Sequence, residues 1–384
     1  MHDSVLVIGA GPAGICSAYW LDRLRIPFRV VDQAAVVGST WANLYPSLQL
    51  NTLNLFSHLP GEMIPLRYGF YPLGKDYYRY LARYVEKRRF PITLNVHVSR
   101  VSPLPEGGWR VESSEGIEDY AAVITATGRF SKPYIPALPG IDTFTGTIIH
   151  AHNFHDPEAF RGKRVIVVGT GPSGGDIAGA LAGIAQTPIT LSVRSDIVLG
   201  RKYPLGLPHT FWQIVVNQLP KRWQKPIQNA TVYRGFPDMK SLPIRFAPNR
   251  EDRQGTSAPI RGRELYDALK SGAVIGAAGV QGFDDDSVVF SDGTRCPADV
   301  VILCTGYRPA MDYLNLPYEV DKDGLPVRAV DPVFGSEGMQ IDGYPGLYLV
   351  GRYYRGYGAF HNFRKEARIA AHQIKRDVFD LIHS

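Results

Sequence analysis

Two glycine motifs of the same form, VLVIGAGPAG at 5–14 and VIVVGTGPSG at 165–174, are the strongest chemical signal in the chain. An unbroken apolar run before the glycines is typical of a parallel strand buried on both faces. The glycines permit a tight turn and bring backbone N–H groups, and the positive end of the next helix, close to a phosphate. One such motif alone also occurs in turns that bind nothing, so the sequence around each copy decides. The predicted contacts are Gly9, Gly11, Pro12, Ala13 and Gly14 in the first copy, and Gly169, Gly171, Pro172, Ser173 and Gly174 in the second.

The residues that follow the two motifs predict different nucleotides. After the first copy we expect a helix over 15–24 and then a strand, PFRVVDQ, that ends in Asp32 and Gln33. An acid at this place accepts hydrogen bonds from ribose hydroxyls. After the second copy, the strand PITLSVRSD brings Arg194 and Ser195 to the same place, with no acid. Arginine at this place can bind the 2′-phosphate that NADPH has and NADH lacks, so it favours NADPH. The alternative is that this arginine is a solvated side chain after a strand.

Two such sites in one chain predict two cofactors. FAD with NADPH is the simplest pair, because a flavin takes a hydride from one site and passes electrons onward. Two further apolar runs ending in Thr-Gly, AAVITATG at 121–128 and ADVVILCTG at 298–306, are candidate crossovers between domains. We expect an α/β fold with two Rossmann-like dinucleotide-binding domains. The NADPH-binding domain, 156–296, would be inserted into a discontinuous FAD-binding domain, 1–155 plus 297–384.

Composition excludes several other classes of protein. The 384 residues are 45% hydrophobic and 20% charged, which is typical of a globular protein and not of a disordered chain or a coiled coil. The three cysteines form no C-x-x-C pair, so a disulfide framework, a zinc site and a redox dithiol are all disfavoured. The uncharged run at 4–21 lacks a basic flank and is broken by Gly and Pro, so it is neither a signal peptide nor a membrane span. We expect a soluble, cytoplasmic protein that binds neither membrane nor nucleic acid, the net charge of +6 being too small to argue for the latter.

A third pattern carries a family resemblance. Residues 144–154, FTGTIIHAHNF, match F-x-G-x-x-x-H-x-x-x-[Y/F], the fingerprint of flavin-containing monooxygenases, between the two glycine motifs as in that family. The segments GSTW at 38–41, NLYPSLQLNT at 43–52, ATGRFSKPYIP at 126–136 and CTGYRP at 304–309 resemble the family as well. The resemblance spans essentially the whole chain. It is nearest to the short soluble bacterial members and the plant YUCCA-type enzymes.

The resemblance implies a flavin monooxygenase cycle. NADPH reduces FAD, NADP⁺ stays bound, and O₂ adds to flavin C4a to give a (hydro)peroxyflavin that transfers one oxygen atom to a small organic substrate. The fingerprint ends in Phe154, where Baeyer–Villiger enzymes have Trp-Pro, so oxygenation at N or S is favoured. The alternatives are Baeyer–Villiger oxygenation of a carbonyl, and a flavin-dependent NADPH reductase or oxidase. A disulfide-reductase type would need a dithiol, and an accessory flavoprotein would need a defective second motif.

The same resemblance assigns the remaining site residues. Asn51, in LQLNT, matches the family's asparagine beside the flavin, whose amide can donate to the peroxide and to NADP⁺; without the family it would be a turn or capping residue. His150 belongs to the fingerprint, so a metal site with His152 and His155 is disfavoured and no metal is expected. The other expected contacts are Thr40, Trp41, Thr52, Val98, Ala126, Gly128 and Gly351 with FAD, and Arg201 with NADPH.

Basic residues are concentrated at 201–264, the segment expected to form the substrate-access region. It holds 12 Lys and Arg against 4 Asp and Glu. One explanation is that its field attracts an anionic substrate; the other is a solvated face with contacts to NADPH phosphates, for instance from Arg201 and Lys202. Arg261 in APIRG stands where YUCCA-type sequences have an aspartate, so their substrate is not carried over. A homodimer is expected only because dimers are common.

Overall fold

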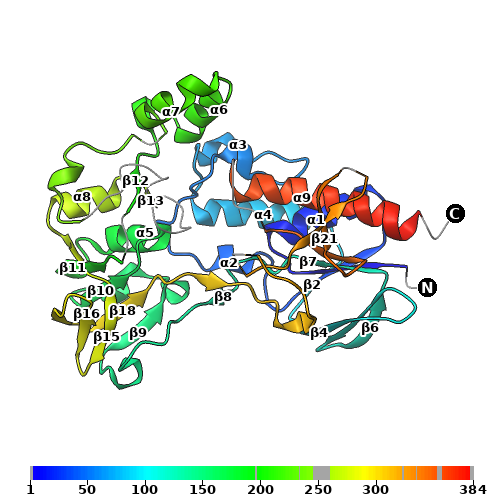
Figure 1. Cartoon of the computed structure of the whole chain (residues 1–384), viewed down its shortest axis with the longest axis horizontal. Helices are drawn as coiled ribbons and strands as arrows, with labels where there is room; N and C mark the ends of the chain where they lie inside the picture. The colour runs from blue at the N-terminus through cyan, green and yellow to red at the C-terminus, as the bar shows by residue number, and fades with distance from the viewer. Residues whose placement is uncertain are drawn as a thin grey trace. The chain divides into compact units, whose positions relative to one another are not determined.

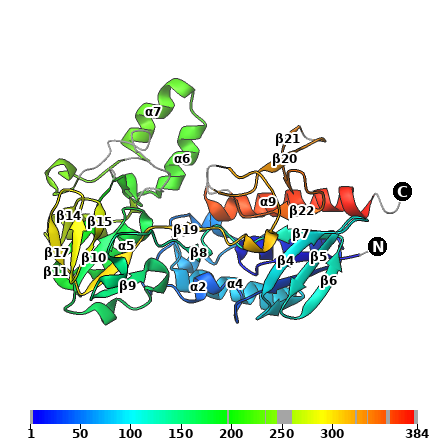
Figure 2. The same cartoon turned by 60° about the horizontal axis from the view of Figure 1, so that its bottom comes forward.

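The computed structural model describes residues 3–194, 197–232, 234–244, 260–321, 324–333, 335–352 and 357–380. The chain divides into two compact units. Figure 1 and Figure 2 colour the chain by residue number from blue at the N-terminus to red at the C-terminus. Unit 1 comprises Met1–Leu44, Thr52–Lys132 and Tyr307–Ser384, and unit 2 comprises Tyr45–Asn51 and Pro133–Gly306. The chain passes between the two main parts at the short strands β8 (Lys132–Pro133) and β19 (Tyr307–Arg308). Unit 2 is therefore an insertion in unit 1.

Unit 1 is built on a sheet of order β20-β21-β22-β7-β1-β2-β3. The central strands β1 (Val5–Ile8) and β7 (Ala122–Thr125) pair in parallel and are buried at every position, because both faces of the sheet are covered. Helices α1 (Pro12–Arg23) and α9 (Ala359–Ile374) pack side by side (Figure 1). The remaining strands of the sheet are β2 (Phe28–Asp32), β3 (Ile92–Leu94), β20 (Arg328–Asp331), β21 (Ser336–Ile341) and β22 (Leu347–Leu349).

A second sheet of unit 1 covers the other side of the core. It is the antiparallel meander of β4 (Val98–Pro103), β5 (Trp109–Ser113) and β6 (Gly116–Tyr120). Val101 and Trp109 from this meander form one apolar cluster with Leu6, Val123 and Leu349 of the large sheet. The other helices of the unit are α2 (Ser39–Ala42), α3 (Asn54–Ser57) and α4 (Gly74–Arg88).

Unit 2 has a parallel sheet of order β14-β11-β10-β18-β9. These strands are β9 (Thr147–His150), β10 (Arg164–Val168), β11 (Gln186–Ser192), β14 (Val274–Ala277) and β18 (Val300–Leu303). Helices α5 (Pro172–Leu181) and α8 (Glu264–Lys270) pack against each other beside the sheet. The basic segment and the residues just before it form β12 (Leu199–Gly200), α6 (His209–Asn217), α7 (Lys221–Ala230) and β13 (Ile260–Arg261). A separate antiparallel meander contains β15 (Val280–Asp284), β16 (Ser287–Phe290) and β17 (Arg295–Pro297).

The predicted α/β fold, with two Rossmann-like units and the second inserted in the first, is confirmed. The packing boundaries of the units differ from the sequence boundaries at 155 and 297. Strands β9 and β18, placed by the sequence in the FAD-binding domain, pair in parallel with each other and, through β18, with β10 of unit 2. Which cofactor each unit binds stays a prediction. In the described part of the chain, no helix combines the length and the apolar character needed to cross a membrane.

Candidate functional site

The first glycine of each motif occupies the same strained turn. Gly9 has φ +110° and Gly169 has φ +111°, a region that side chains other than glycine rarely adopt. A Cβ atom on Gly9 would lie 2.6 Å from the carbonyl oxygen of Ala126, just after β7. A Cβ atom on Gly169 would lie 2.6 Å from the carbonyl oxygen of Cys304, just after β18. Both turns therefore pass directly over the end of the neighbouring parallel strand, and only glycine fits.

The last glycine of each motif lets the helix approach the turn. A Cβ atom on Gly14 would lie 1.8 Å from the carbonyl oxygen of Gly9, and one on Gly174 would lie 1.9 Å from that of Gly169. The middle glycine, Gly11, has open space instead, with no described atom within 4 Å of a Cβ placed there. No side chain of the described residues caps α1 or α5, so the first N–H groups of both helices have no side-chain partner at the cap. This is the local geometry of a phosphate cradle, and it occurs twice.

Asp32 is fastened beside the first turn. Its Oδ2 accepts a hydrogen bond from the N–H of Ala10 at 2.6 Å, and its Oδ1 accepts one from the N–H of Ala34 at 2.9 Å. Each carboxylate oxygen can accept a second hydrogen bond, so the side chain can still receive ribose hydroxyls. Gln33 is exposed, and its Oε1 lies 3.3 Å from Nδ1 of His97.

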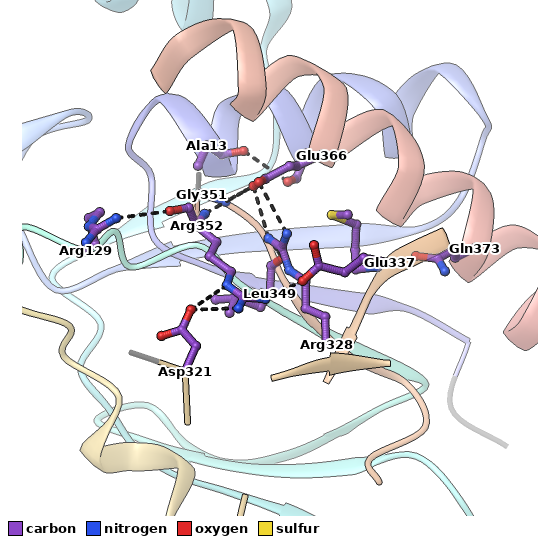
Figure 3. Close-up of polar contacts among 12 residues, drawn as sticks. Ala13, Arg129, Asp321, Arg328, Glu337, Leu349, Gly351, Arg352, Glu366 and Gln373 are labelled. Carbon is purple, nitrogen blue, oxygen red and sulfur yellow. Dashed lines mark hydrogen bonds and ion pairs between the residues drawn. The ribbon is translucent and has the colours of Figure 1, made fainter. Parts of the chain in front are cut away.

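Gly351, two residues beyond β22, is held beside the first motif by a buried acid. The Gly351 N–H donates to Oε2 of Glu366 at 2.6 Å, and a Cβ atom on Gly351 would lie 3.2 Å from Cβ of Ala13. Figure 3 shows Glu366 reaching from α9 to this turn. Arg328 pairs with Glu366, Nη2 to Oε2 at 3.2 Å, and also donates to the carbonyl oxygen of Leu349 at 2.6 Å. Glu366 and Arg328 are each only 4% exposed, so this ion pair is desolvated.

The sequence interpretation missed Glu366 and Arg328. An acid in a charged helix such as FRKEARIAAHQI is usually a surface residue. Helical spacing could have predicted that Glu366 is buried, because it lies three residues after Phe363 and four before Ala370, on the buried stripe of α9. A second arginine, Arg352, donates through Nε and Nη2 to Oδ2 of Asp321 at 2.9 and 2.7 Å (Figure 3).

The other residues expected near FAD lie in unit 1 as follows. Trp41 is half-buried and packs edge-on against Tyr77, with ring centroids 4.8 Å apart, and against Phe360 at 5.4 Å. Thr52 bonds Ser57 through the two hydroxyl oxygens at 2.7 Å. Val98 and Ala126 are buried, Thr40 is exposed, and Gly128 has φ +77° with open space around it. Their contact with a flavin stays a prediction.

Two arginines expected at the NADPH phosphates differ in surroundings. Arg194 is exposed just beyond β11, while Ser195 lies outside the described residues. Arg201 donates from Nε to the carbonyl oxygen of Gly235 at 3.0 Å, and its guanidinium lies 5.2 Å from the ring centroid of Phe236. Arg261 is 7% exposed and donates from Nη1 to the carbonyl oxygen of Val232 at 2.8 Å. Arg261 therefore binds a backbone carbonyl group inside unit 2.

Asn51 ends the short segment Tyr45–Asn51 of unit 2. Its Oδ1 is buried and has no hydrogen-bond partner among the described residues. A buried amide end without a partner is costly, so a bound group with a complementary polar atom fits here. This orphaned atom makes unit 2 compatible with a bound polar group. The open space at Gly11 separately makes the first motif of unit 1 compatible with a phosphate.

His150 is accounted for by structure. Its Nε2 lies 2.9 Å from the carbonyl oxygen of Gly306, and its Nδ1 accepts the N–H of His152 at 3.0 Å. Burial lowers the pKa of His150, so the ring is neutral with its proton on Nε2. It thereby links the end of β9 to the turn after β18. Among the described residues, no three His, Cys, Asp or Glu side chains are grouped to hold a metal ion.

Comparison with known proteins identifies the family. Residues 38–324 match the family described as flavin-binding monooxygenase-like. A 4-hydroxybenzoate brominase (decarboxylating) of Pseudoalteromonas luteoviolacea is 28% identical over 82% of this chain and 65% of its own length. The indole-3-pyruvate monooxygenase YUCCA8 of Oryza sativa subsp. indica is 28% identical over 92% of this chain and 87% of its own. This chain thus spans about two thirds of the length of the brominase.

A solved flavin-containing monooxygenase from Stenotrophomonas maltophilia has a TM-score of 0.71 at 25% identity, covering 97% of this chain and 99% of that one. Cyclohexanone monooxygenase from Rhodococcus sp. Phi1, solved with NADP⁺, shares the fold with a TM-score of 0.71 at 18% identity, covering 98% of this chain and 85% of that one. The resemblance to flavin monooxygenases and the expectation of a flavin cofactor are confirmed by the family match, while NADPH as the second cofactor stays a prediction. The chain belongs to the flavin-binding monooxygenase-like family.

Proposed function

We propose that this protein is an NADPH- and O₂-dependent flavin monooxygenase acting on a small organic substrate. The reaction consumes NADPH, H⁺, O₂ and substrate, and yields NADP⁺, water and the substrate carrying one added oxygen atom. The observation that carries the proposal is the repeated turn at Gly9 and Gly169, with the same φ and the same 2.6 Å approach to a carbonyl. Two nucleotides bound in one chain of this family permit hydride transfer to a flavin.

The chain's own residues would do binding and positioning. The N–H groups at the start of α1 would bind the FAD pyrophosphate, and Asp32 would orient its ribose. The N–H groups at the start of α5 would bind the NADPH pyrophosphate, with Arg194 at the 2′-phosphate. The buried, unpartnered Oδ1 of Asn51 would accept a hydrogen bond from a bound cofactor. FAD, when bound, supplies the redox chemistry with O₂, so no side-chain nucleophile is needed.

The finer proposal is oxygenation at nitrogen or sulfur, with oxygenation of a carbonyl as the alternative. Phe154 at the end of the fingerprint favours the first, because Baeyer–Villiger enzymes have Trp-Pro there. One relative is a rat dimethylaniline monooxygenase [N-oxide-forming] 4, at 30% identity over 83% of this chain and 60% of its own length. The solved cyclohexanone monooxygenase shares the fold alone. Cytoplasmic location and a homodimer stay predictions from the sequence.

The decisive experiment is oxygen labelling. The FAD-loaded protein is supplied with NADPH and ¹⁸O₂, together with a tertiary amine, a thioether or a cyclic ketone. The masses of the products are then measured by mass spectrometry. One ¹⁸O atom in the amine oxide or sulfoxide supports the proposal, and one in a lactone supports the carbonyl alternative. NADPH oxidation that ends only in H₂O₂ with every substrate would indicate an oxidase. If NADPH does not reduce the flavin under anaerobic conditions, the assignment of the second glycine motif to NADPH is overturned.

A further inference from the structure

The segment Tyr45–Asn51 is anchored in the core of unit 2 by aromatic packing. Tyr45 is 6% exposed, and its ring meets that of Phe154 edge-on, with centroids 5.3 Å apart. Phe154 is 1% exposed and stacks in turn on Phe160. Phe154, the aromatic residue that ends the fingerprint, therefore packs directly against the first residue of this segment. Asn51 lies six residues after Tyr45.

A second anchor joins the segment to the helix of the second glycine motif. The Tyr45 hydroxyl donates a hydrogen bond to the carboxylate of Asp176 on α5. Asp176 lies two residues beyond Gly174, whose close approach to Gly169 fixes the start of that helix. Any movement of Tyr45 is thus resisted by the element expected to hold the NADPH pyrophosphate.

A third anchor comes from the basic segment. Lys202 donates from Nζ to Oε1 of Gln49 at 2.7 Å. Gln49 is two residues before Asn51. Burial lowers the pKa of Lys202, whereas the negative charges of Asp176 and Glu264 favour its charged form. One lysine therefore links Gln49 to the acid that holds Tyr45.

We propose that Tyr45, Gln49, Asp176 and Lys202, the tether cluster, are positioning residues that hold Asn51 in a fixed place relative to α5. This inference rests on the proposed function. The polar anchors act at Tyr45 and Gln49, the first and fifth residues of the segment, and the orphaned Oδ1 of Asn51 lies at its last residue. With the anchors intact, Asn51 presents its amide in one position; with them broken, the segment samples several. Oxygenation then loses efficiency, and NADPH consumption ends in H₂O₂.

Asp176 gives the tether cluster a pH dependence. Burial raises the pKa of Asp176 to about 7, against the lowering effects of Lys202 and of the Tyr45 hydroxyl. The charged or titratable groups that act on it are Lys202, Glu264 and Tyr45, and Cys304 is influenced by it in turn. Above pH 7 the ionised carboxylate attracts Lys202 and accepts from Tyr45 most strongly. Below pH 7 protonation removes the charge, so the tether loosens as pH falls.

Conservative variants separate anchoring from packing. Tyr45→Phe keeps the ring on Phe154 and removes only the hydroxyl. Lys202→Met keeps the length of the side chain and removes the charge, whereas Lys202→Arg and Gln49→Glu each keep a bond between positions 49 and 202. Asp176→Asn imitates the protonated acid. Lys221→Met is the matched control, because Lys221 is an exposed lysine on α7 of the same basic segment.

Two measurements are made on the FAD-loaded protein. The first is hydrogen–deuterium exchange of the peptide covering 45–51, which reports motion without turnover. We expect Lys202→Met and Tyr45→Phe to speed exchange there about tenfold, the factor that loss of a charged hydrogen bond predicts. Lys202→Arg, Gln49→Glu and Lys221→Met should exchange as the wild type does. The second is the fraction of oxidised NADPH that is recovered as H₂O₂ in the presence of an oxygenated substrate.

We expect the H₂O₂ fraction to rise in the tether variants, while the anaerobic rate of flavin reduction by NADPH stays unchanged in Tyr45→Phe. In the wild type it should rise as pH falls from 8 to 6, and Asp176→Asn should be high and flat over that range. Unchanged exchange and unchanged H₂O₂ fraction in Lys202→Met overturn the inference, as does a higher KM for NADPH as the sole effect. If Lys202→Met does not fold, Gln49→Leu breaks the same bond without removing a charge. Failure of the wild type to oxidise NADPH overturns the proposed function instead, because exchange is read without turnover.

Discussion

The carboxylate of Glu366 accepts the backbone N–H of Gly351 at 2.6 Å and holds the end of β22 next to the first glycine motif. Its counter-charge, Arg328, is equally buried. Removing one member of a buried ion pair leaves the other charge without compensation, which costs about 3–5 kcal/mol. We expect Glu366→Gln to lower the free energy of unfolding by that amount and to weaken FAD retention. Urea denaturation and the flavin content of the purified protein measure the two effects.

A double-mutant cycle provides the control. Arg328→Met should be destabilising alone, but combined with Glu366→Gln it should recover part of the loss, because no unpaired charge then remains. Strictly additive losses would contradict the interpretation of the two residues as one coupled pair.

Gly11 separates ligand binding from folding. Its φ of −79° is available to alanine, and no described atom would lie within 4 Å of the new Cβ. We expect Gly11→Ala to leave stability within about 0.5 kcal/mol of the wild type. FAD affinity should fall at least about tenfold, because the methyl group occupies the approach to the phosphate. Titration of the apoprotein with FAD tests this, and unchanged affinity would show that the turn does not face the cofactor.

The two motifs should fail independently when their last glycines are altered. A Cβ on Gly14 or on Gly174 would lie within 2 Å of a backbone oxygen, so either turn must distort. Gly174→Ala is expected to retain flavin and lose NADPH-dependent reduction, while Gly14→Ala is expected to lose flavin. Absorbance of the purified protein and anaerobic mixing with NADPH distinguish the two. Loss of flavin from Gly174→Ala in a folded protein would reverse the assignment of cofactors to the units.

Arg194 is expected to select NADPH over NADH. Its side chain is exposed, so Arg194→Gln should not affect stability. Loss of a charged hydrogen bond to the 2′-phosphate, about 1.5–3 kcal/mol, predicts a 10- to 100-fold lower kcat/KM with NADPH. The value for NADH should not change, since NADH lacks that phosphate. An equal decrease for both nucleotides would place Arg194 elsewhere in the site.

His209 should make the protein sensitive to acid. Burial, then the charges of Arg261 and Lys202, lower its pKa to about 3. Between that value and about 6.5, the usual histidine pKa, the unfolded chain binds a proton that the folded chain does not. Stability contributed by the neutral ring is therefore fully present above pH 6.5 and is lost as pH falls. Asp176, with a raised pKa of about 7, acts in the opposite direction over much of this range.

The expected slope from His209 is up to one proton, or about 1.4 kcal/mol per pH unit. His209→Gln should therefore show a shallower decline of unfolding free energy between pH 6 and pH 4 than the wild type. Parallel curves for the two proteins would mean that the ring is protonated in the folded state.

The sequence alone determined the features that depend on neighbouring residues. The two motifs at 5–14 and 165–174 predicted strand, turn and helix, because the short contacts of Gly14 and Gly174 lie within their own motifs. Asp32, at the end of the strand that follows the first motif, and Arg194, just beyond the strand that follows the second, were likewise found from their positions in the sequence. The fingerprint at 144–154 predicted the family without any knowledge of contacts.

Only the tertiary structure decided what each strand, segment and charge meets. β9 and β18 read like any buried strands, and their place beside β10 follows from hydrogen bonds between strands far apart in the chain. Nothing next to Glu366 or Arg261 in the sequence names their partners, which are 38 and 29 residues away. The anchoring of Tyr45 and Gln49 by Asp176 and Lys202 spans well over a hundred residues. Local backbone geometry is encoded by neighbours, whereas the partner of a buried polar group is set by the packing that excludes water from it.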